Sequence, residues 1–428
     1  MSAALTARIA EDFAAAQALA PAPAEGRRRA AFEVLHAAGL PSTRDENWKY
    51  ANLRALERLR FVPAAAAAAP QGLALPAPLV GFSRYVFVDG RFAPELSAAA
   101  VDGFASLAAT PQALSASSPT GARGTDERFA LLNEAFATDG ARIHLAAGAP
   151  AQRLEVIFVA CADGDRGTSY PRLEVSLGAH TQLELIERHL SAAAGAASTV
   201  DSAAVIELAR GARLTHYRLQ GLSGSTIAFD TLQATLAEDT VYRLHGVSTG
   251  AAAARSTQIL RLTGARAHLS MALAALGDRQ QVQDTFALVE HRAPHTRTEQ
   301  LFRGIAAGRA RVACNGKIVV APSAAGTDSQ QSLRGLLAGT DAEIDVRPQL
   351  EIYTDDVRCS HGATAGKLDD NMLFYLLARG LDRDTALRLL KWAFLADAFA
   401  KIELPELRRQ IEASLAEVLK DAALKELL

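Results

Sequence analysis

The chain has 428 residues, 49% of them hydrophobic and 21% charged, so it can bury a large core and is long enough for two or three domains. Its 45 basic and 47 acidic residues give a net charge of −2, which offers no electrostatic basis for binding nucleic acid or an anionic membrane. Cys161, Cys314 and Cys359 are too few and too widely spaced for a zinc site or a four-cysteine cluster site made by this chain alone.

The N-terminal region, residues 1–62, is expected to be helical, because Leu5, Ile9 and Phe13 recur at the spacing of one helix face. The chain begins with acidic side chains among alanines rather than a signal peptide, and no run of about 18 apolar residues occurs, so we expect a soluble cytoplasmic protein. Residues 63–80 hold four prolines and a run of six alanines, a composition typical of a linker.

Residues 81–141 are expected to lead into the core through a hairpin and a helix. The segment Tyr85–Phe92 alternates aromatic and β-branched residues around Asp89-Gly90, which is a hairpin signal. Residues 126–138 return to the apolar spacing of a helix.

The predicted core, residues 142–365, consists of short strands with alternating polarity, of which residues 343–352 are the clearest. A short turn motif recurs roughly 26 to 44 residues apart and is centred on Gly178, Gly211, Glu238, Gly264, Gly308 and Gly339. A coil of that length cannot bury its own apolar face, but stacked coils can. We therefore expect a β-solenoid, most simply a parallel β-helix, although an antiparallel β-sandwich would show similar short strands.

Residues 366–428 return to helical spacing, with predicted helices at about 373–380, 387–399 and 406–428. The second of these carries Trp392 and Phe394 and is apolar on more than one side. Such a helix needs cover from a binding partner or from the rest of the fold, and the sequence leaves both possibilities open.

One short segment, Cys359-Ser360-His361, is a candidate for metal or thiol chemistry. No phosphate-binding loop is present, so the chain is not expected to hydrolyse ATP alone. In Cys359-Ser360-His361, strand geometry places Cys359 and His361 on one face, where they could share a metal or the imidazole could lower the thiol pKa. The alternatives are a buried cysteine that acts as a small hydrophobe and a histidine with a structural role.

Several segments resemble sequences shared by the SufB/SufD family. These are Val-Arg-Cys-Ser-His-Gly-Ala-Thr at 357–364, Leu-Leu-Lys-Trp-Ala-Phe at 389–394, Pro-Ser-Thr-Arg-Asp-Glu-Asn-Trp-Lys-Tyr at 41–50, the hairpin at 88–92 and the segment 132–140. Within this family the chain resembles the SufD branch more than the SufB branch. It has the Trp-Lys-Tyr segment and a modest length, and it lacks a Cys-Gly-Ala-His sequence.

The resemblance implies a right-handed parallel β-helix flanked by helical regions, in a scaffold subunit of iron–sulfur cluster assembly that is not itself an enzyme. It implies pairing with a SufB paralogue through the β-helices and binding of the ATPase SufC to the C-terminal helices, where Trp392 and Phe394 would make contact. His361 would be a metal ligand that holds a transient iron–sulfur cluster at the partner interface, with Cys359 beside it.

The same resemblance implies a reduced flavin bound by the assembled complex, and the isolated chain is expected to be able to form a homodimer. Two alternative functions are weighed against the scaffold role. A β-helix carbohydrate-active enzyme would need a groove lined with carboxylates, and Asp355-Asp356 is the only adjacent acidic pair in the later coils, where turn chemistry explains it as well. A purely structural subunit would position its partners without binding the cluster.

Overall fold

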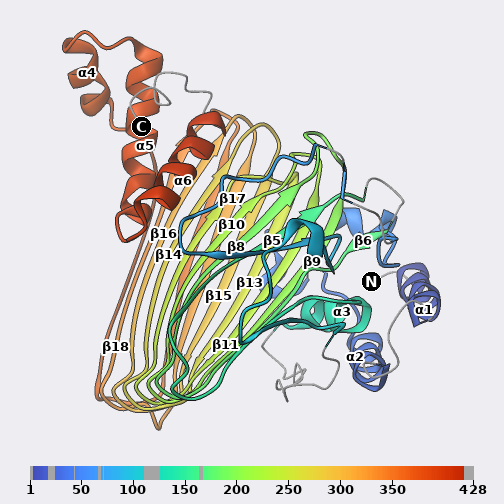
Figure 1. Cartoon of the computed structure of the whole chain (residues 1–428). Coiled ribbons are helices and arrows are strands. Elements are labelled where there is room, and N and C mark those ends of the chain that lie inside the picture. The colour runs from blue at the N-terminus through green and yellow to red at the C-terminus, as the bar shows by residue number, and fades with distance from the viewer. Residues whose placement is uncertain are drawn as a thin grey trace.

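Two long sheets form the body of the molecule (Figure 1), and the computed structural model describes residues 3–17, 25–42, 44–65, 69–70, 72–109, 126–162 and 167–418. Sheet 1 has the strand order β2 (Arg91–Phe92), β1 (Ser83–Val88), β5 (Gln152–Ala160), β8 (Gln182–Ser191), β10 (Arg213–Gly221), β12 (Val241–Ser248), β14 (His268–Gly277), β16 (Arg297–Ala307), β18 (Thr327–Ala338) and β20 (Val357–Lys367). Sheet 2 has the order β19 (Glu343–Ile352), β17 (Arg311–Val320), β15 (Val282–His291), β13 (Ala253–Leu262), β11 (Ile227–Leu236), β9 (Thr199–Leu208), β7 (Arg172–Leu177), β4 (Ala141–Leu145) and β3 (Phe104–Ser106), while β6 (Thr168–Ser169) pairs with β9.

From β7 onward the chain alternates between the two sheets, and each strand pairs in parallel with the strand one coil later. Leu214 of β10 is in register with Tyr242 of β12, which is in register with Leu269 of β14. The predicted solenoid is therefore confirmed. The sandwich alternative is wrong, because among the described strands only β1–β2 and β3–β4 pair antiparallel.

The turn motif found in the sequence belongs to two different edges of the solenoid. Gly211, Glu238 and Gly264 lie in turns that lead from sheet 2 to sheet 1, whereas Gly308 and Gly339 lie in turns that lead back. The longest interval in the motif crosses from one edge to the other. Successive turns on the first edge are joined by backbone hydrogen bonds, such as the one that Gly211 N–H donates to the Glu238 carbonyl at 2.9 Å.

The interior between the sheets is filled mainly by aliphatic side chains, one from each coil at each level. One such row runs through Leu208, Leu236 and Leu262 on neighbouring strands of sheet 2, and all three side chains are buried. Truncating a buried leucine to alanine in a core of this kind costs about 2–5 kcal/mol. The stacking of coils therefore supplies the burial that a single coil lacks.

The predicted hairpin is confirmed at β1 and β2, where Val88 is in register with Arg91. Asp89 and Gly90 have φ values of 45° and 80°, as a two-residue hairpin turn requires. In the predicted linker, Ala64 N–H donates to the Thr168 carbonyl at 2.9 Å, while residues 66–68 and 71 lie outside the described part of the chain.

The predicted N-terminal helices are α1 (Ala3–Gln17), α2 (Glu25–Ala38) and α3 (Arg128–Phe136), with short 3-10 turns at Glu46–Trp48, Arg54–Arg58 and Pro94–Leu96. The three helices and the first two turns pack on the outer face of sheet 2 (Figure 1), whereas the turn at Pro94–Leu96 lies against β1 of sheet 1. The rings of Phe129 in α3 and Phe229 in β11 stack with centroids 3.9 Å apart, and the Arg255 guanidinium of β13 lies 4.4 Å from the Trp48 ring. These contacts fix the N-terminal region to the middle coils.

The C-terminal helices are α4 (Asp370–Ala378), α5 (Arg383–Phe399) and α6 (Pro405–Val418), as predicted, with residues 419–428 of the last predicted helix outside the described part. Helices α5 and α6 cover the outer face of sheet 1 and share an apolar cluster with its strands, whereas α4 projects away from it (Figure 1). Arg303 of β16 pairs with Asp397 of α5. No helix in the described ranges has both the length and the hydropathy to span a membrane.

Candidate functional site

The last coil leaves one end of the solenoid open. Strands β19 and β20 are the final strands of their sheets, so each has one edge without a neighbouring strand among the described residues. β20 pairs with β18 along its whole length, and its residues from Ser360 to Lys367 are exposed. A long, exposed edge strand presents unpaired backbone groups that another chain can pair with.

Both predicted site residues lie on this edge strand. Cys359 is in register with Ser329 and His361 with Gln331, and both partners are buried in the solenoid interior. The two side chains therefore continue neighbouring interior rows, as the alternation predicted. Cys359 is half-buried and packs against the interior apolar cluster, whereas His361 is exposed because no further coil covers it.

Electrostatics at Cys359 favour the neutral thiol. Burial is the main cause that raises the pKa of Cys359, and the negative charge of Asp328 raises it further. A thiolate ligand needs the opposite shift. Within the described ranges no group of three or more histidine, cysteine or acidic side chains is placed to hold a metal ion.

Behind Cys359 and His361, two polar rows run into the interior. Thr298 and Ser329 share a hydrogen bond of 2.7 Å in the row that ends at Cys359. Gln331 Nε2 donates to Gln300 Oε1 at 3.0 Å in the row that ends at His361. Cys359 thus continues a row of hydroxyl side chains, and His361 continues a row of side-chain amides.

A groove of about 420 Å³ connects this end to the C-terminal helices, and its lining includes His361, Ser360, Glu299, Asp397 and Lys401. Lys401, just after α5, pairs with Glu299 of β16 at 2.9 Å. The helical region and the edge strand therefore border one surface depression.

Large apolar residues of α4 and α5 differ in exposure. Trp392 and Phe394 are half-buried and pack against the apolar cluster that joins α5 and α6 to sheet 1. On α4, by contrast, Met372, Phe374 and Tyr375 are 59%, 72% and 55% exposed. The most exposed apolar surface of this region is therefore on α4, which the sequence pattern did not single out.

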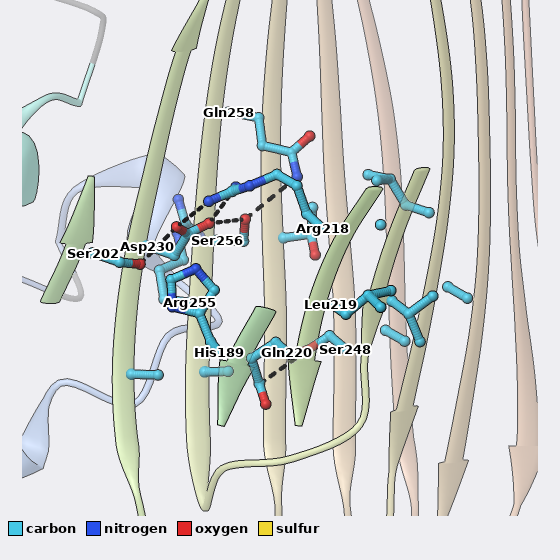
Figure 2. A pocket seen from close by; sticks show the side chains of 18 of the residues that line it. His189, Ser202, Arg218, Leu219, Gln220, Asp230, Ser248, Arg255, Ser256 and Gln258 are labelled. Atoms are coloured by element: carbon cyan, nitrogen blue, oxygen red, sulfur yellow. Dashed lines mark hydrogen bonds and ion pairs between the residues drawn. The ribbon is translucent and has the colours of Figure 1, made fainter. Parts of the chain in front are cut away.

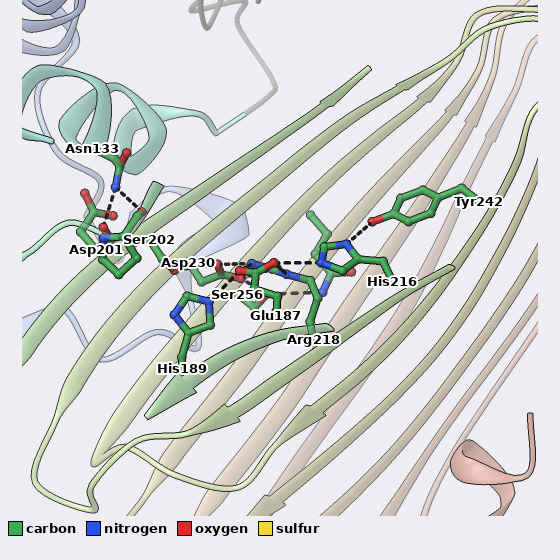
Figure 3. Close-up of polar contacts among 12 residues, drawn as sticks. Asn133, Glu187, His189, Asp201, Ser202, His216, Arg218, Asp230, Tyr242 and Ser256 are labelled. Carbon is green, nitrogen blue, oxygen red and sulfur yellow. Dashed lines mark hydrogen bonds and ion pairs between the residues drawn. The ribbon is translucent and has the colours of Figure 1, made fainter. Parts of the chain in front are cut away.

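An ionic network inside the solenoid was also missed by sequence reasoning (Figure 3). Arg218 of β10 donates to both carboxylate oxygens of Glu187 at 2.8 Å and to both of Asp230 at 2.9 Å. His189 Nε2 and His216 Nε2 lie 2.6 and 3.0 Å from Glu187. The network therefore links three coils by charge-assisted hydrogen bonds.

The charges of this network hold one another in place. Burial alone would raise the pKa of Glu187, but the Arg218 guanidinium and hydrogen bonds from Arg218, His189 and His216 bring it well below its usual value. Burial also lowers the pKa of His216, against the opposing effect of Glu187. Glu187 is therefore ionised and His216 neutral at physiological pH.

A cavity of about 80 Å³ lies beside the network (Figure 2). Arg218, Asp230, Ser256 and Gln258 are among its polar lining residues, and leucine, alanine, valine and phenylalanine side chains form the apolar parts. Cavities of this size hold a few water molecules. Glu187 and Arg218 are in register on neighbouring coils. Their separation by about one coil length is the sequence signal that could have paired them.

Comparisons with known proteins give a consistent result. The family model described as "SUF system FeS cluster assembly, SufBD core domain" matches residues 159–394. The chain is 31% identical over 414 residues to the iron–sulfur cluster assembly protein SufD of Escherichia coli, a match that covers 94% of this chain and 95% of that protein. It is 30% identical over 410 residues to a SufBD family protein of Synechocystis, covering 90% and 89%. A SufBD family protein of Mycobacterium tuberculosis is 29% identical over 212 residues, covering 48% and 53%.

Proposed function

The chain belongs to the SufB/SufD family of iron–sulfur cluster assembly proteins, and from this premise we propose that it is the SufD-like subunit of a scaffold formed with a SufB paralogue and the ATPase SufC. The observation that carries the proposal is the open end of the solenoid, where the exposed edge strand β20 presents His361.

Pairing with the SufB paralogue is proposed to use β19 and β20. Both strands end their sheets at the same end of the solenoid, and their side chains are less buried than those of the preceding coil. A second solenoid could extend both sheets by backbone hydrogen bonds and cover the last interior row. The same edges would allow the isolated chain to form the expected homodimer.

The nascent iron–sulfur cluster is the cargo of this interface, and His361 is proposed to be the ligand that this chain contributes. Its imidazole is exposed at the end of an interior row, whereas Cys359 is half-buried with a raised thiol pKa. We therefore assign Cys359 a supporting place beside the cluster. The paralogue would supply the remaining ligands, since this chain alone offers too few.

The ATPase SufC is proposed to bind the C-terminal helical region. Phe374 and Tyr375 on α4 are exposed and available for contact, and Trp392 and Phe394 on α5 are half-buried, so part of each side chain is also available. Aromatic side chains of this kind are the usual anchors of protein interfaces. ATP hydrolysis would then come from the partner, which agrees with a cytoplasmic scaffold subunit that has no catalysis of its own.

A reduced flavin, if the assembled complex binds one, needs a site larger than the interior cavity. That cavity measures about 80 Å³, and cofactor pockets usually measure about 300–1,000 Å³. The groove of about 420 Å³ beside His361 falls within that range, so we propose that a flavin would bind at this groove or between subunits rather than in the interior cavity.

Co-expression with a SufB paralogue and SufC tests the proposal. We expect the three chains to purify together and to support cluster formation, and we expect His361→Ala to keep the complex but lose most of the cluster yield. His144→Ala is a matched control, because His144 is exposed on β4, away from the open end. Normal cluster formation by His361→Ala would instead make this chain a purely structural subunit, and failure to purify with either partner would refute the scaffold proposal.

A further inference from the structure

The interior row that ends at His361 contains two glutamines in succession. Gln300 of β16 is in register with Gln331 of β18, which is in register with His361 of β20. Neighbouring strands of a sheet lie about 4.8 Å apart, so side chains at successive positions of such a row are within contact distance. Gln331 therefore occupies the row position between Gln300, to which its amide is hydrogen-bonded, and His361.

The amide of Gln331 is only partly satisfied. Its Nε2 donates to Gln300 Oε1 at 3.0 Å, but its Oε1 is buried and has no hydrogen-bond partner among the described residues. Gln331 as a whole is 4% exposed, although its side chain also borders the groove beside His361. A buried acceptor without a donor is unfavourable, and the next side chain toward the open end, His361, carries ring nitrogens that can donate.

A glycine on the opposite sheet makes room for this amide. A Cβ atom added to Gly316 of β17 would lie 2.4 Å from Gln331 Nε2 and 3.0 Å from its Cδ. Any side chain at residue 316 would therefore displace the Gln331 amide from its place in the row. The fold thus provides a fitted position for a polar group directly behind His361.

We propose that Gln331 is a positioning residue for His361: its Oε1 accepts one ring N–H of His361 and leaves the other ring nitrogen directed toward the open end. A histidine that binds a metal commonly donates its second ring N–H to a carbonyl or carboxylate oxygen, which fixes the tautomer and the ring orientation. The inference rests on the proposed function, because it gives His361 the orientation that a cluster ligand needs.

The tautomer of His361 in the isolated full-length chain tests the inference directly. Histidine side chains labelled with ¹⁵N report the tautomer by NMR at alkaline pH, where imidazole is neutral, and the His361→Ala spectrum assigns the signal. We expect about a tenfold preference for one tautomer in the unmodified protein, the effect of one hydrogen bond. Gln331→Leu and Gly316→Ala should both reduce this preference several-fold. Gln331→Glu, which keeps an acceptor oxygen, should retain the preference.

Gln330→Leu is the matched control, because Gln330 is the preceding residue on the same strand but is exposed on the other face. An unchanged tautomer ratio in folded Gln331→Leu, or an equal loss in Gln330→Leu, would overturn the inference. Thermal unfolding of each variant verifies that it is folded. The result is independent of the proposed function, since the tautomer is read without partner or cluster. If the tautomer depends on Gln331 but His361→Ala still assembles clusters, Gln331 positions His361 but His361 is not a cluster ligand.

Discussion

Replacing Arg218 with methionine should strongly destabilise the solenoid. The Arg218 side chain is 9% exposed and that of Glu187 is 2% exposed, so the substitution leaves the Glu187 carboxylate in the interior with two histidines beside it. The Asp230 carboxylate loses its arginine as well. Removing one partner of a buried ion pair costs about 3–5 kcal/mol. The change in unfolding free energy at pH 7, measured by urea denaturation with circular dichroism, should fall in that range.

A double variant separates the charge effect from lost packing. Arg218→Met with Glu187→Gln removes both charges of the more deeply buried pair, and substituting both members of a buried ion pair is often close to neutral. Asp230 also loses Arg218 in both variants, but its side chain is 21% exposed and still accepts hydrogen bonds from Ser202 and Ser256. We therefore expect the double variant to be more stable than Arg218→Met alone, by about 2 kcal/mol or more. A loss below about 1 kcal/mol in Arg218→Met, or strictly additive losses in the double variant, would refute the reasoning.

The pH dependence follows from the lowered pKa of Glu187. Because the folded-state pKa lies below the usual value of 4.5, the ionised carboxylate stabilises the fold above pH 4.5, and this stabilisation is lost as pH falls through the folded-state value. The stability difference between the unmodified protein and Arg218→Met should therefore shrink in acid. A difference that stays constant from pH 7 to pH 3 would contradict the assignment of an ionised Glu187.

Three further outcomes are expected. Burial, and secondarily Asp230, raises the pKa of Asp201 well above its usual 3.8, and both its carboxylate oxygens lack a partner in the described structure, so stability should fall as pH rises above 3.8. Asp201→Asn should then gain about 1–3 kcal/mol at pH 7 in the same urea assay, and a loss would show that the carboxylate has a favourable partner. Phe374→Glu should weaken SufC binding in a pull-down without lowering the melting temperature. Trp392→Glu should lower the melting temperature, because Trp392, unlike Phe374, packs on sheet 1. Normal SufC binding by Phe374→Glu together with a lower melting temperature would place the SufC contact elsewhere. Cys359 should react with iodoacetamide several-fold more slowly than a free thiol at pH 7, since its pKa is raised, and a faster reaction would reveal a thiolate.

The architecture could be predicted because it repeats. Turn residues such as Gly211 and Gly308 mark coil edges, and the alternation in residues 343–352 marks a strand even though that strand ends its sheet. What the turns could not reveal is which edge each belongs to, since both edges use the same residue types. That distinction depends on which sheet the strand before each turn belongs to, and only the pairing register of the strands defines this.

The candidate site was predictable in part. Alternation places Cys359 and His361 on one face, but their unequal burial depends on β20 being the last strand, which no local pattern shows. The interior network joins Glu187, Arg218 and Asp230, residues separated by whole strands in the sequence. Charged residues in strands are usually solvent-exposed, so only the coil register reveals that these face inward and meet.

Hydrogen–deuterium exchange of this chain, alone and in complex with a SufB paralogue, tests the central claim most directly. If the open end is the pairing surface, the amides of β20 (Val357–Lys367) and β19 (Glu343–Ile352) that do not bond to β18 and β17 should exchange quickly in the isolated monomer and become protected in the complex. The outer faces of the middle coils should show no comparable change. Protection confined to other strands, with β19 and β20 exchanging as before, would contradict the account.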